Sequence, residues 1–424
     1  MRHLTFILSS ILLSTFVSLF SYDASAATRN VCFRLRIEDD RFACATTSDT
    51  GNRRGCNPGG HSDFVGARFE LWDKDSGSGD EFIGLYRISG TGTRCAVFEW
   101  ENASYSKGET NPDVYVKMRS YIGRTSGGPY VQAVDFDGDK YPSTTWRNGT
   151  SSDDDAYVSR NCKSGETCNI GTIYPTDDSA SDRGQYVQML DSAQHVLQIY
   201  GSDMDSGTID AWYPGTDQLP SCPTGTAFSR SDFCLPSSLG SDGDRVTHEM
   251  GHILQMQMFN QDVLRDALIG GQWQWDTTES ESAATTEGWA SYVGTVAWYN
   301  PQASGVDPRF SGWDVEEVDT LTTQCTGNRT FPGQGAKAFW DYDDDNNEDG
   351  AVSTSQWDDR NDKPTTWMAR QWDEFSNGTG NRDDFESGMD GVNLRDYLHY
   401  SCNGCSASTE TLIEHNCMQG QSND

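Results

Sequence analysis

The stretch VTHEMGHILQ, residues 246–255, places two histidines four positions apart, with a glutamate directly after the first. On an α-helix, residues i and i+4 lie one turn apart on the same face, so His248 and His252 can bind one metal ion together. Glu249 then lies close enough to take a proton from a water molecule that the metal activates. The stretch therefore predicts a helix that carries two metal ligands and a general base.

A catalytic zinc ion takes three protein ligands, so one more ligand is needed. One class of zinc protease supplies it as H-x-x-G-x-x-H, but residues 253–258 read ILQMQM and lack that signature. The stretch ESESAATTEGWASYVGTVAW, residues 279–298, offers three glutamates. Read as a helix, it surrounds Glu287 with small residues that allow a close approach to the histidine helix, whereas Glu279 and Glu281 lie in a polar stretch. The predicted zinc ligands are His248, His252 and Glu287.

The residues that carry this prediction also resemble a known family. HEMGH, with TEGWASY placing its glutamate 35 positions after His252, resembles the gluzincins, the thermolysin-like zinc metallopeptidases. EGWASY is similar to the E-G-F-A helix of zinc aminopeptidases and to the E-G-W-S-D helix of fungalysin-type proteases. The resemblance covers residues 180–300 well, is looser to about residue 400, and does not reach the N-terminal region. It implies a zincin-like fold, a bound zinc ion, and a protein or peptide substrate.

The sequence departs from this family at Ser291. Thermolysin- and fungalysin-type enzymes have an aspartate four residues after the glutamate ligand, where it orients a histidine. A different hydrogen bond must therefore support the ligands here. Gluzincins also use a tyrosine or histidine to stabilise the oxyanion, and the candidates are Tyr292, Tyr397, His399 and Tyr400.

The first 26 residues have the plan of a secretory signal peptide. Arg2 and His3 precede an apolar run, and the run ends before Ala24-Ser25-Ala26, an A-x-A cleavage site. A membrane anchor is the rival interpretation, but the run is short and interrupted by serines. No later stretch is apolar enough to span a bilayer. We expect a secreted protein, or a periplasmic one in a Gram-negative host, with no membrane span after signal removal.

Twelve cysteines follow the signal, and an even number in an exported chain predicts up to six disulfides. Sequential pairs such as Cys162–Cys168 and Cys222–Cys234 are candidates. The formal charge of −33 disfavours nucleic acid as a partner, because the surface repels phosphates. The composition does not indicate an oligomeric state.

Residues 27–145 alternate apolar and polar side chains in short runs, such as VCFRLRI from Val31 and ARFELW from Ala67. Turn-rich segments separate these runs, which is typical of a β-sandwich. This region could be a binding module, a prodomain or a structural platform. Residues 146–180 read as a linker with a disulfide loop.

The periodicity changes at about residue 183, where a helix with Gly201 as its C-cap is expected. The strand TIDAWY follows, and then the histidine helix. GAKAFWDY and NLRDYLHY predict helices near the C-terminus. The expected fold class is α+β: a signal peptide (1–26), an all-β sandwich (27–145), a linker (146–180), and a zincin-like metallopeptidase domain with a helical C-terminal part (181–424).

A second metal is suggested by an acidic loop in which Asp345, Asn347 and Asp349 match the first half of an EF-hand. Gln356 stands where a bidentate glutamate is expected. DFDGDK at 135–140 is a similar oxygen-rich turn. These loops could bind Ca²⁺, but solvated acidic loops on an acidic protein are the simpler interpretation.

The sequence as a whole predicts an exported zinc endopeptidase with Glu249 as the general base. An aminopeptidase is the rival enzyme, suggested by the likeness to the E-G-F-A helix. A non-catalytic extracellular binding protein with a degenerate protease domain is the rival from another class. The zinc content per chain distinguishes the binding protein from the two enzymes, because a binding protein needs no zinc.

Overall fold

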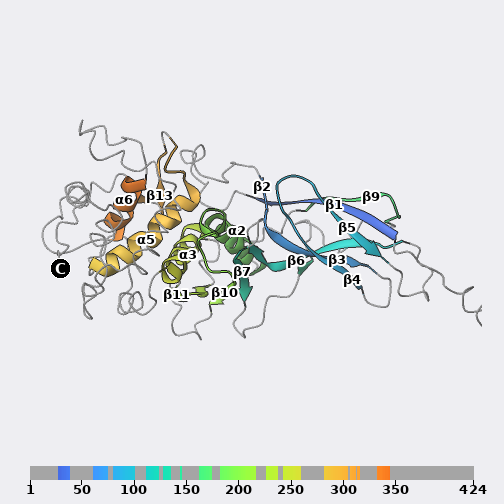
Figure 1. Cartoon of the computed structure of the whole chain (residues 1–424), viewed down its shortest axis with the longest axis horizontal. Helices are drawn as coiled ribbons and strands as arrows, with labels where there is room; N and C mark the ends of the chain where they lie inside the picture. The colour runs from blue at the N-terminus through green and yellow to red at the C-terminus, as the bar shows by residue number, and fades with distance from the viewer. Residues whose placement is uncertain are drawn as a thin grey trace, which may run out of the picture.

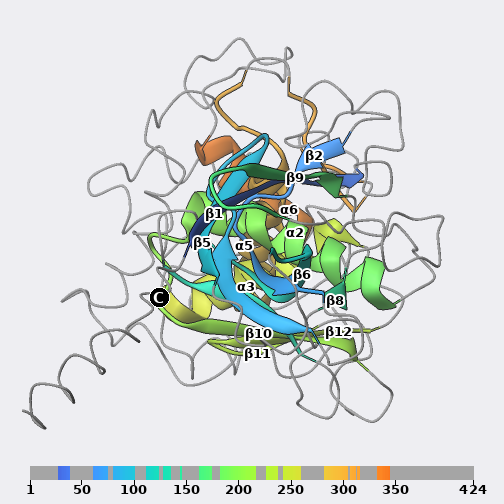
Figure 2. The ribbon, with the colours of Figure 1, turned by 90° about the vertical axis from the view of Figure 1, so that its right-hand side faces the viewer.

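Two sheets formed largely by the N-terminal region lie at one end of the molecule, and the helices extend to the other end (Figure 1). The computed structural model describes residues 27–38, 61–74, 80–100, 111–123, 128–134, 144–145, 162–173, 182–215, 226–236, 242–258, 281–303, 306–311, 313–315 and 332–343. Viewed from the end that carries the first strand, the helices lie behind the strands (Figure 2).

The smaller sheet has the order β2-β1-β5, with β9 added parallel to β1. Its strands are β1 (Ala27–Glu38), β2 (His61–Asp63), β5 (Arg94–Trp100) and β9 (Thr167–Ile173). Val31, Phe33 and Leu35 are buried, as the alternation in β1 predicts. Phe33 meets Phe69 of the larger sheet edge to face, with ring centroids 4.6 Å apart. The two sheets therefore pack against each other through the apolar face of β1.

The larger sheet has the order β11-β12-β10-β7-β6-β3-β4, and β8 pairs with β6. Its strands are β3 (Ala67–Asp73), β4 (Glu81–Arg87), β6 (Val114–Gly123), β7 (Tyr130–Val134), β8 (Thr144–Thr145), β10 (Thr208–Gly215), β11 (Thr226–Ser229) and β12 (Asp232–Pro236). β7 and β10 pair in parallel, from Tyr130↔Thr208 to Val134↔Trp212. One sheet therefore continues across the expected boundary at 145–181, and β9 lies inside the expected linker. The division into separate domains stays a prediction.

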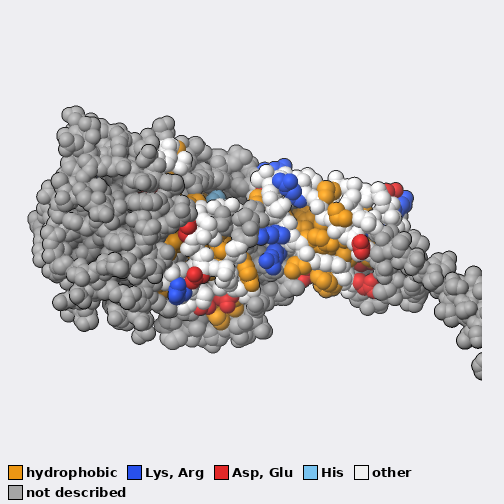
Figure 3. Space-filling view, viewed as in Figure 1, with side chains coloured by type: hydrophobic (Ala, Val, Ile, Leu, Met, Phe, Trp, Pro, Cys, Tyr) orange, Lys and Arg blue, Asp and Glu red, His pale blue; other side chains and the backbone are white. Residues whose placement is uncertain are grey.

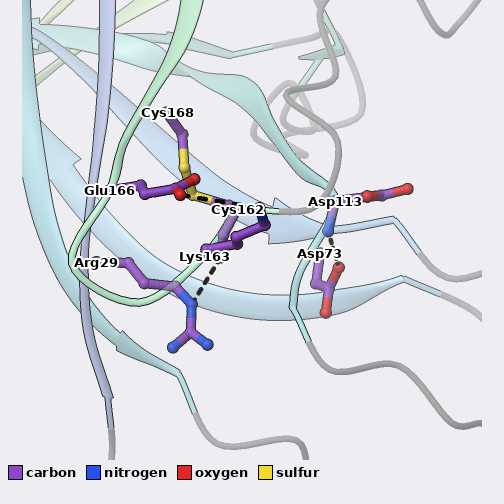
Figure 4. The surroundings of a disulfide bond; sticks show 7 residues. All are labelled: Arg29, Asp73, Asp113, Cys162, Lys163, Glu166 and Cys168. Atoms are coloured by element: carbon purple, nitrogen blue, oxygen red, sulfur yellow. Dashed lines mark hydrogen bonds and ion pairs between the residues drawn. A yellow bond between two sulfur atoms is a disulfide. The ribbon is translucent and has the colours of Figure 1, made fainter.

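Two disulfides join the strands of the smaller sheet and its neighbourhood. Cys32–Cys95 links β1 to β5, and Cys162–Cys168 closes the loop before β9. The predicted pair Cys162–Cys168 is thus confirmed. Figure 4 shows the surroundings of this second disulfide, where Arg29 Nε donates to the carbonyl oxygen of Cys162 at 2.8 Å.

Cys234 on β12 is also disulfide-bonded, but Cys222 lies outside the described residues, so their pairing stays a prediction. Within the described ranges no cysteine is free.

Strand β4 is an edge of the larger sheet, and it carries exposed apolar side chains. Phe82 is 53% exposed and Leu85 is 44% exposed. Hydrophobic side chains gather on this end of the visible face (Figure 3). Exposed apolar groups on a sheet edge are a common feature of surfaces that contact other molecules. The suggested role of the N-terminal region as a binding module stays a prediction.

Four helices are described: α2 (Asp182–Tyr200), α3 (Gly243–Met258), α5 (Glu281–Trp298) and α6 (Pro332–Asp343). All four correspond to predicted helices: those around residues 183–201, the H-E-x-x-H stretch, Glu287 and the GAKAFWDY run. The helix predicted at NLRDYLHY lies outside the described residues. Gly201 ends α2 as predicted, and its N–H donates to the carbonyl oxygen of Leu197 at 3.0 Å. None of these helices is both long and apolar enough to cross a bilayer.

Helix α3 begins at a side-chain cap. Asp242 Oδ1 accepts a hydrogen bond from the N–H of Arg245 at 3.1 Å, the usual geometry of an N-cap. Burial raises the pKa of Asp242, and the charge of Asp244 raises it further. Asp244 Oδ2 accepts the N–H of Ser311 at 2.8 Å and so attaches the hairpin of β13 (Arg309–Phe310) and β14 (Trp313–Asp314) to the start of α3.

The small residues predicted around Glu287 serve two helix interfaces. A Cβ added to Gly251 of α3 would lie 2.8 Å from Ala290 Cα on α5, so the two backbones touch. A Cβ on Gly288 would lie 2.8 Å from Gly335 Cα on α6. The close approach to the histidine helix was expected, whereas the second contact, with α6, is an additional finding. Its cause is that small residues occur on two faces of α5.

We expect Gly251→Ala to destabilise the protein by about 1–3 kcal/mol, because the methyl group must push α3 away from α5. Helix propensity alone favours alanine by about 1 kcal/mol, so packing and propensity predict opposite signs. Thermal unfolding measures the difference. Gly207→Ala is the matched control, because a Cβ there meets nothing within 4 Å. Stabilisation by Gly251→Ala would contradict the close approach.

Asp63 joins the smaller sheet to the turn between β4 and β5. Its two carboxylate oxygens accept Arg34 Nε at 2.5 Å and Arg34 Nη2 at 3.0 Å. Oδ2 also accepts the N–H of Gly92 at 2.8 Å. The hydrogen bonds from Arg34 hold the pKa of Asp63 below its ordinary value, because they favour the ionised form more than burial disfavours it.

Asp63→Asn should cost about 1–2 kcal/mol at neutral pH, because the charge-assisted bonds are lost. The native pKa lies below the unfolded value of about 3.9, so this stabilisation is present above that value. It disappears as the pH falls through the native pKa. Melting temperatures of wild type and variant should therefore differ at pH 7 and pH 5, and the difference should shrink as the pH falls below the unfolded pKa and through the native one. Asp307→Asn, at a partly exposed ion pair with Arg309, should have little effect at any pH.

Candidate metal centre

The structure brings His248 and His252 of α3 together with Glu287 of α5. One ligand atom from each residue lies within 4.8 Å of the other two. His248 Nε2 is 3.1 Å from Glu287 Oε2 and 3.1 Å from His252 Nε2, and His252 Nε2 is 3.5 Å from Glu287 Oε1. Two imidazole nitrogens and one carboxylate oxygen thus converge on one point.

All three side chains are buried, with exposed fractions of 4%, 4% and 6%. Burial alone raises the pKa of Glu287, but the attraction of His252 and the hydrogen bonds from both histidines outweigh it. The pKa of Glu287 therefore lies far below its ordinary range. The carboxylate is ionised, which suits it to a cation.

The two histidines respond differently to this carboxylate. Burial lowers the pKa of His248, and its hydrogen bond to the Glu287 carboxylate does not compensate. Burial also lowers the pKa of His252, but there the charge of Glu287, its hydrogen bond and the charge of Glu249 outweigh burial and raise it. Without a bound cation, a proton on His252 rather than on His248 therefore neutralises the negative charge of Glu287.

The donor set fits a transition-metal ion. Two neutral imidazoles and one carboxylate are the protein ligands of the His₂Glu class of catalytic zinc site. The mutual distances leave the three donor atoms facing one another without an intervening side chain. A divalent cation would also replace the proton that otherwise balances the buried charge of Glu287.

Ser291 contacts His248 at Nδ1, the ring nitrogen that faces away from Glu287. Its Oγ lies 3.2 Å from His248 Nδ1, and it is one turn after Glu287 on α5. When Nδ1 carries the proton, this N–H donates to the serine hydroxyl and leaves Nε2 free to bind a metal. Ser291, at which the sequence departs from the resembled pattern, therefore offers His248 a hydroxyl as its hydrogen-bond partner.

Glu249 is 2% exposed, and Arg245 lies beside it on the same helix. Arg245 Nε is 3.2 Å from Glu249 Oε1, with the partners at positions i and i+4. The ion pair limits the rotamers of the carboxylate. Arg245 was not among the predicted site residues, although its spacing from Glu249 was a signal for this pair.

Phe310 of β13 covers one side of the site. Its ring centroid is 5.8 Å from that of His248, and a Cβ on Gly294 would lie 2.6 Å from its Cε2. The hairpin thus packs against both α3 and α5 and helps to exclude water from His248. No motif in the sequence marked it.

Tyr292 is the one oxyanion candidate within the described residues. It is fully buried, and its hydroxyl donates to Asp343 Oδ2 on α6 at 2.7 Å. This hydrogen bond commits the hydroxyl to the α5–α6 interface. The other candidates and the suggested calcium ligands lie outside the described residues: Tyr397, His399, Tyr400, Asp345, Asn347 and Asp349.

Comparison with known proteins identifies no family. No protein-family model and no curated protein matches the chain. A solved structure, the 9R-lipoxygenase from Cyanothece PCC8801, is similar at 12% identity with a TM-score of 0.20. The similarity covers 46% of this chain and 27% of the lipoxygenase chain. A TM-score this low carries no argument about fold or activity.

Ser291→Ala should weaken metal binding by about 10-fold, because His248 loses the partner that fixes its tautomer and ring orientation. Competition of the protein with a chelator for Zn²⁺ measures this. Ser192→Ala is the control: Ser192 is also a buried helical serine, but its Oγ has no hydrogen-bond partner among the described residues. Equal affinities of the two variants would contradict the role of Ser291.

Proposed function

We propose that this chain is an exported zinc metallopeptidase that cleaves peptide bonds within protein or peptide substrates. The observation that carries the proposal is the buried convergence of His248, His252 and Glu287, with Glu249 on the same helix. The order of the elements, helix α2, strand β10, histidine helix α3 and glutamate helix α5, agrees with the resemblance to the gluzincins.

Zinc is the metal that this donor set suits best among those available to exported hydrolases. When bound, zinc polarises the scissile carbonyl and lowers the pKa of a water molecule. His248, His252 and Glu287 would hold it. The rigid α3–α5 contact keeps these three donors in place before the metal arrives, so little side-chain ordering is needed for binding.

Glu249 performs the proton transfers in the proposed reaction. Its carboxylate takes a proton as the water oxygen forms a bond to the carbonyl carbon. It then delivers that proton to the amide nitrogen as the carbon–nitrogen bond breaks, and the products are a carboxylate and an amine. Arg245 holds the carboxylate in one orientation from the preceding turn.

The proposed location outside the cytoplasm rests on two features. The N-terminal 26 residues have the plan of a signal peptide. The disulfides Cys32–Cys95 and Cys162–Cys168 are bonds that persist in oxidising compartments. The N-terminal β region would then be a sandwich that packs on the catalytic part through the shared sheet.

Glu249→Gln tests the proposal. The variant should keep one zinc per chain and lose activity by about 10²–10⁴-fold, because the amide cannot accept the proton. Cleavage of a mixed peptide library by zinc-loaded protein, read by mass spectrometry, is the measurement. Glu166→Gln is the control, since Glu166 is an exposed glutamate remote in sequence from the site.

Three outcomes would change the proposal. Removal of residues only from N-termini would favour the aminopeptidase. Zinc binding without cleavage by the wild type would indicate a degenerate enzyme. Absence of zinc binding would favour the non-catalytic binding protein.

A further inference from the structure

Gln255 lies on the face of α3 that carries the two histidine ligands. It follows His252 by three positions and His248 by seven, so the three residues line one side of the helix. Gln255 is completely buried. Neither its amide oxygen nor its amide nitrogen has a hydrogen-bond partner among the described residues. A buried amide in this state destabilises the fold, so its presence calls for a functional reason.

His252 has an unpartnered atom on the same turn of the helix. Its Nδ1 is buried and has no hydrogen-bond partner within the described part of the chain. His248, in contrast, has Ser291 at its Nδ1. A histidine that binds a metal through Nε2 carries a proton on Nδ1, and that N–H needs an acceptor. One of the two ligands thus has this support and the other lacks it.

We propose that Gln255 is the positioning residue of His252: when zinc binds, the amide oxygen of Gln255 accepts the Nδ1–H of His252. Side chains at i and i+3 are neighbours on a helix, with Cβ atoms about 5–6 Å apart. Glutamine has three side-chain torsions, so rotation within the site brings its oxygen to the ring. One hydrogen bond then satisfies two of the three unpartnered atoms. The inference rests on the proposed zinc site and assigns a residue that the H-E-x-x-H motif does not contain.

A positioning role and a purely structural role predict different results for Gln255→Met. Methionine has a similar volume and no polar atom, so it removes the buried unpartnered amide. The metal-free variant should therefore melt higher than the wild type, by roughly 1–3 °C. Its zinc affinity should fall by about 10-fold or more, because His252 loses its acceptor. The two effects have opposite signs.

Gln188→Met is the matched control. Gln188 on α2 is also buried, and both of its amide atoms have no partner among the described residues. It lies on another helix and supports no predicted ligand. Its replacement should raise the melting temperature in the same way and leave zinc affinity within about 2-fold of the wild type. Zinc affinity is measured by chelator competition, and the Co²⁺ absorption spectrum reports ligand geometry without any assay of activity.

Gln255→Glu provides the second variant, because a carboxylate is also an acceptor for Nδ1–H. Its zinc affinity should equal or exceed that of the wild type. Unchanged affinity in Gln255→Met, or an equal loss in Gln255→Met and Gln255→Glu, would overturn the inference. If the methionine variant does not fold, the glutamate variant decides: a 10-fold loss there overturns it. Failure of the wild type to bind zinc would instead overturn the proposed function together with this inference.

Discussion

The backbone contact between Gly251 and Ala290 holds together the two helices that carry the three residues of the candidate metal centre. A single added Cβ would lie 2.8 Å from the facing helix, so the distance between α3 and α5 is set by the absence of side-chain atoms. At this distance, a glutamate on one helix reaches two histidines on the other. A longer separation would leave the same residues in the sequence but no shared point for a cation.

The same proximity creates an electrostatic problem that a cation solves. Glu287 is ionised and buried, and the positive charge that acts on it most strongly among the described residues is that of His252, with hydrogen bonds from both histidines. Taking an isolated carboxylate out of water is costly, and a partly protonated histidine pair balances it incompletely. A divalent cation satisfies the carboxylate and both ring nitrogens at once. The metal would therefore be part of what stabilises the helix pair.

Local spacing in the sequence predicted the parts of the site that belong to one helix. The i, i+4 spacing on α3 predicted His248 and His252 as ligands, with Glu249 between them as the base. Glu287, on α5, was predicted from the small residues that surround it. The pairing of β7 with β10 could not be predicted in this way, because alternation marks a strand but not its neighbour. The contact of α5 with α6 was missed for a related reason: glycines on two faces of a helix do not reveal which partner each face meets.

The hydrogen bonds at Nδ1 of the two histidines depend both on local sequence spacing and on contacts between helices. Ser291 was recognised in the sequence only as a departure from a family pattern, and the structure shows that it reaches His248 across the helix interface. His248 is thus held by the partner helix, and its orientation depends on the α3–α5 distance. Within the described part of the chain, Nδ1 of His252 has no such partner on α5, and the acceptor that we propose for it, Gln255, lies on its own helix. The two ligands of one motif therefore differ in what fixes them, so a change in helix packing should disturb the first histidine more than the second.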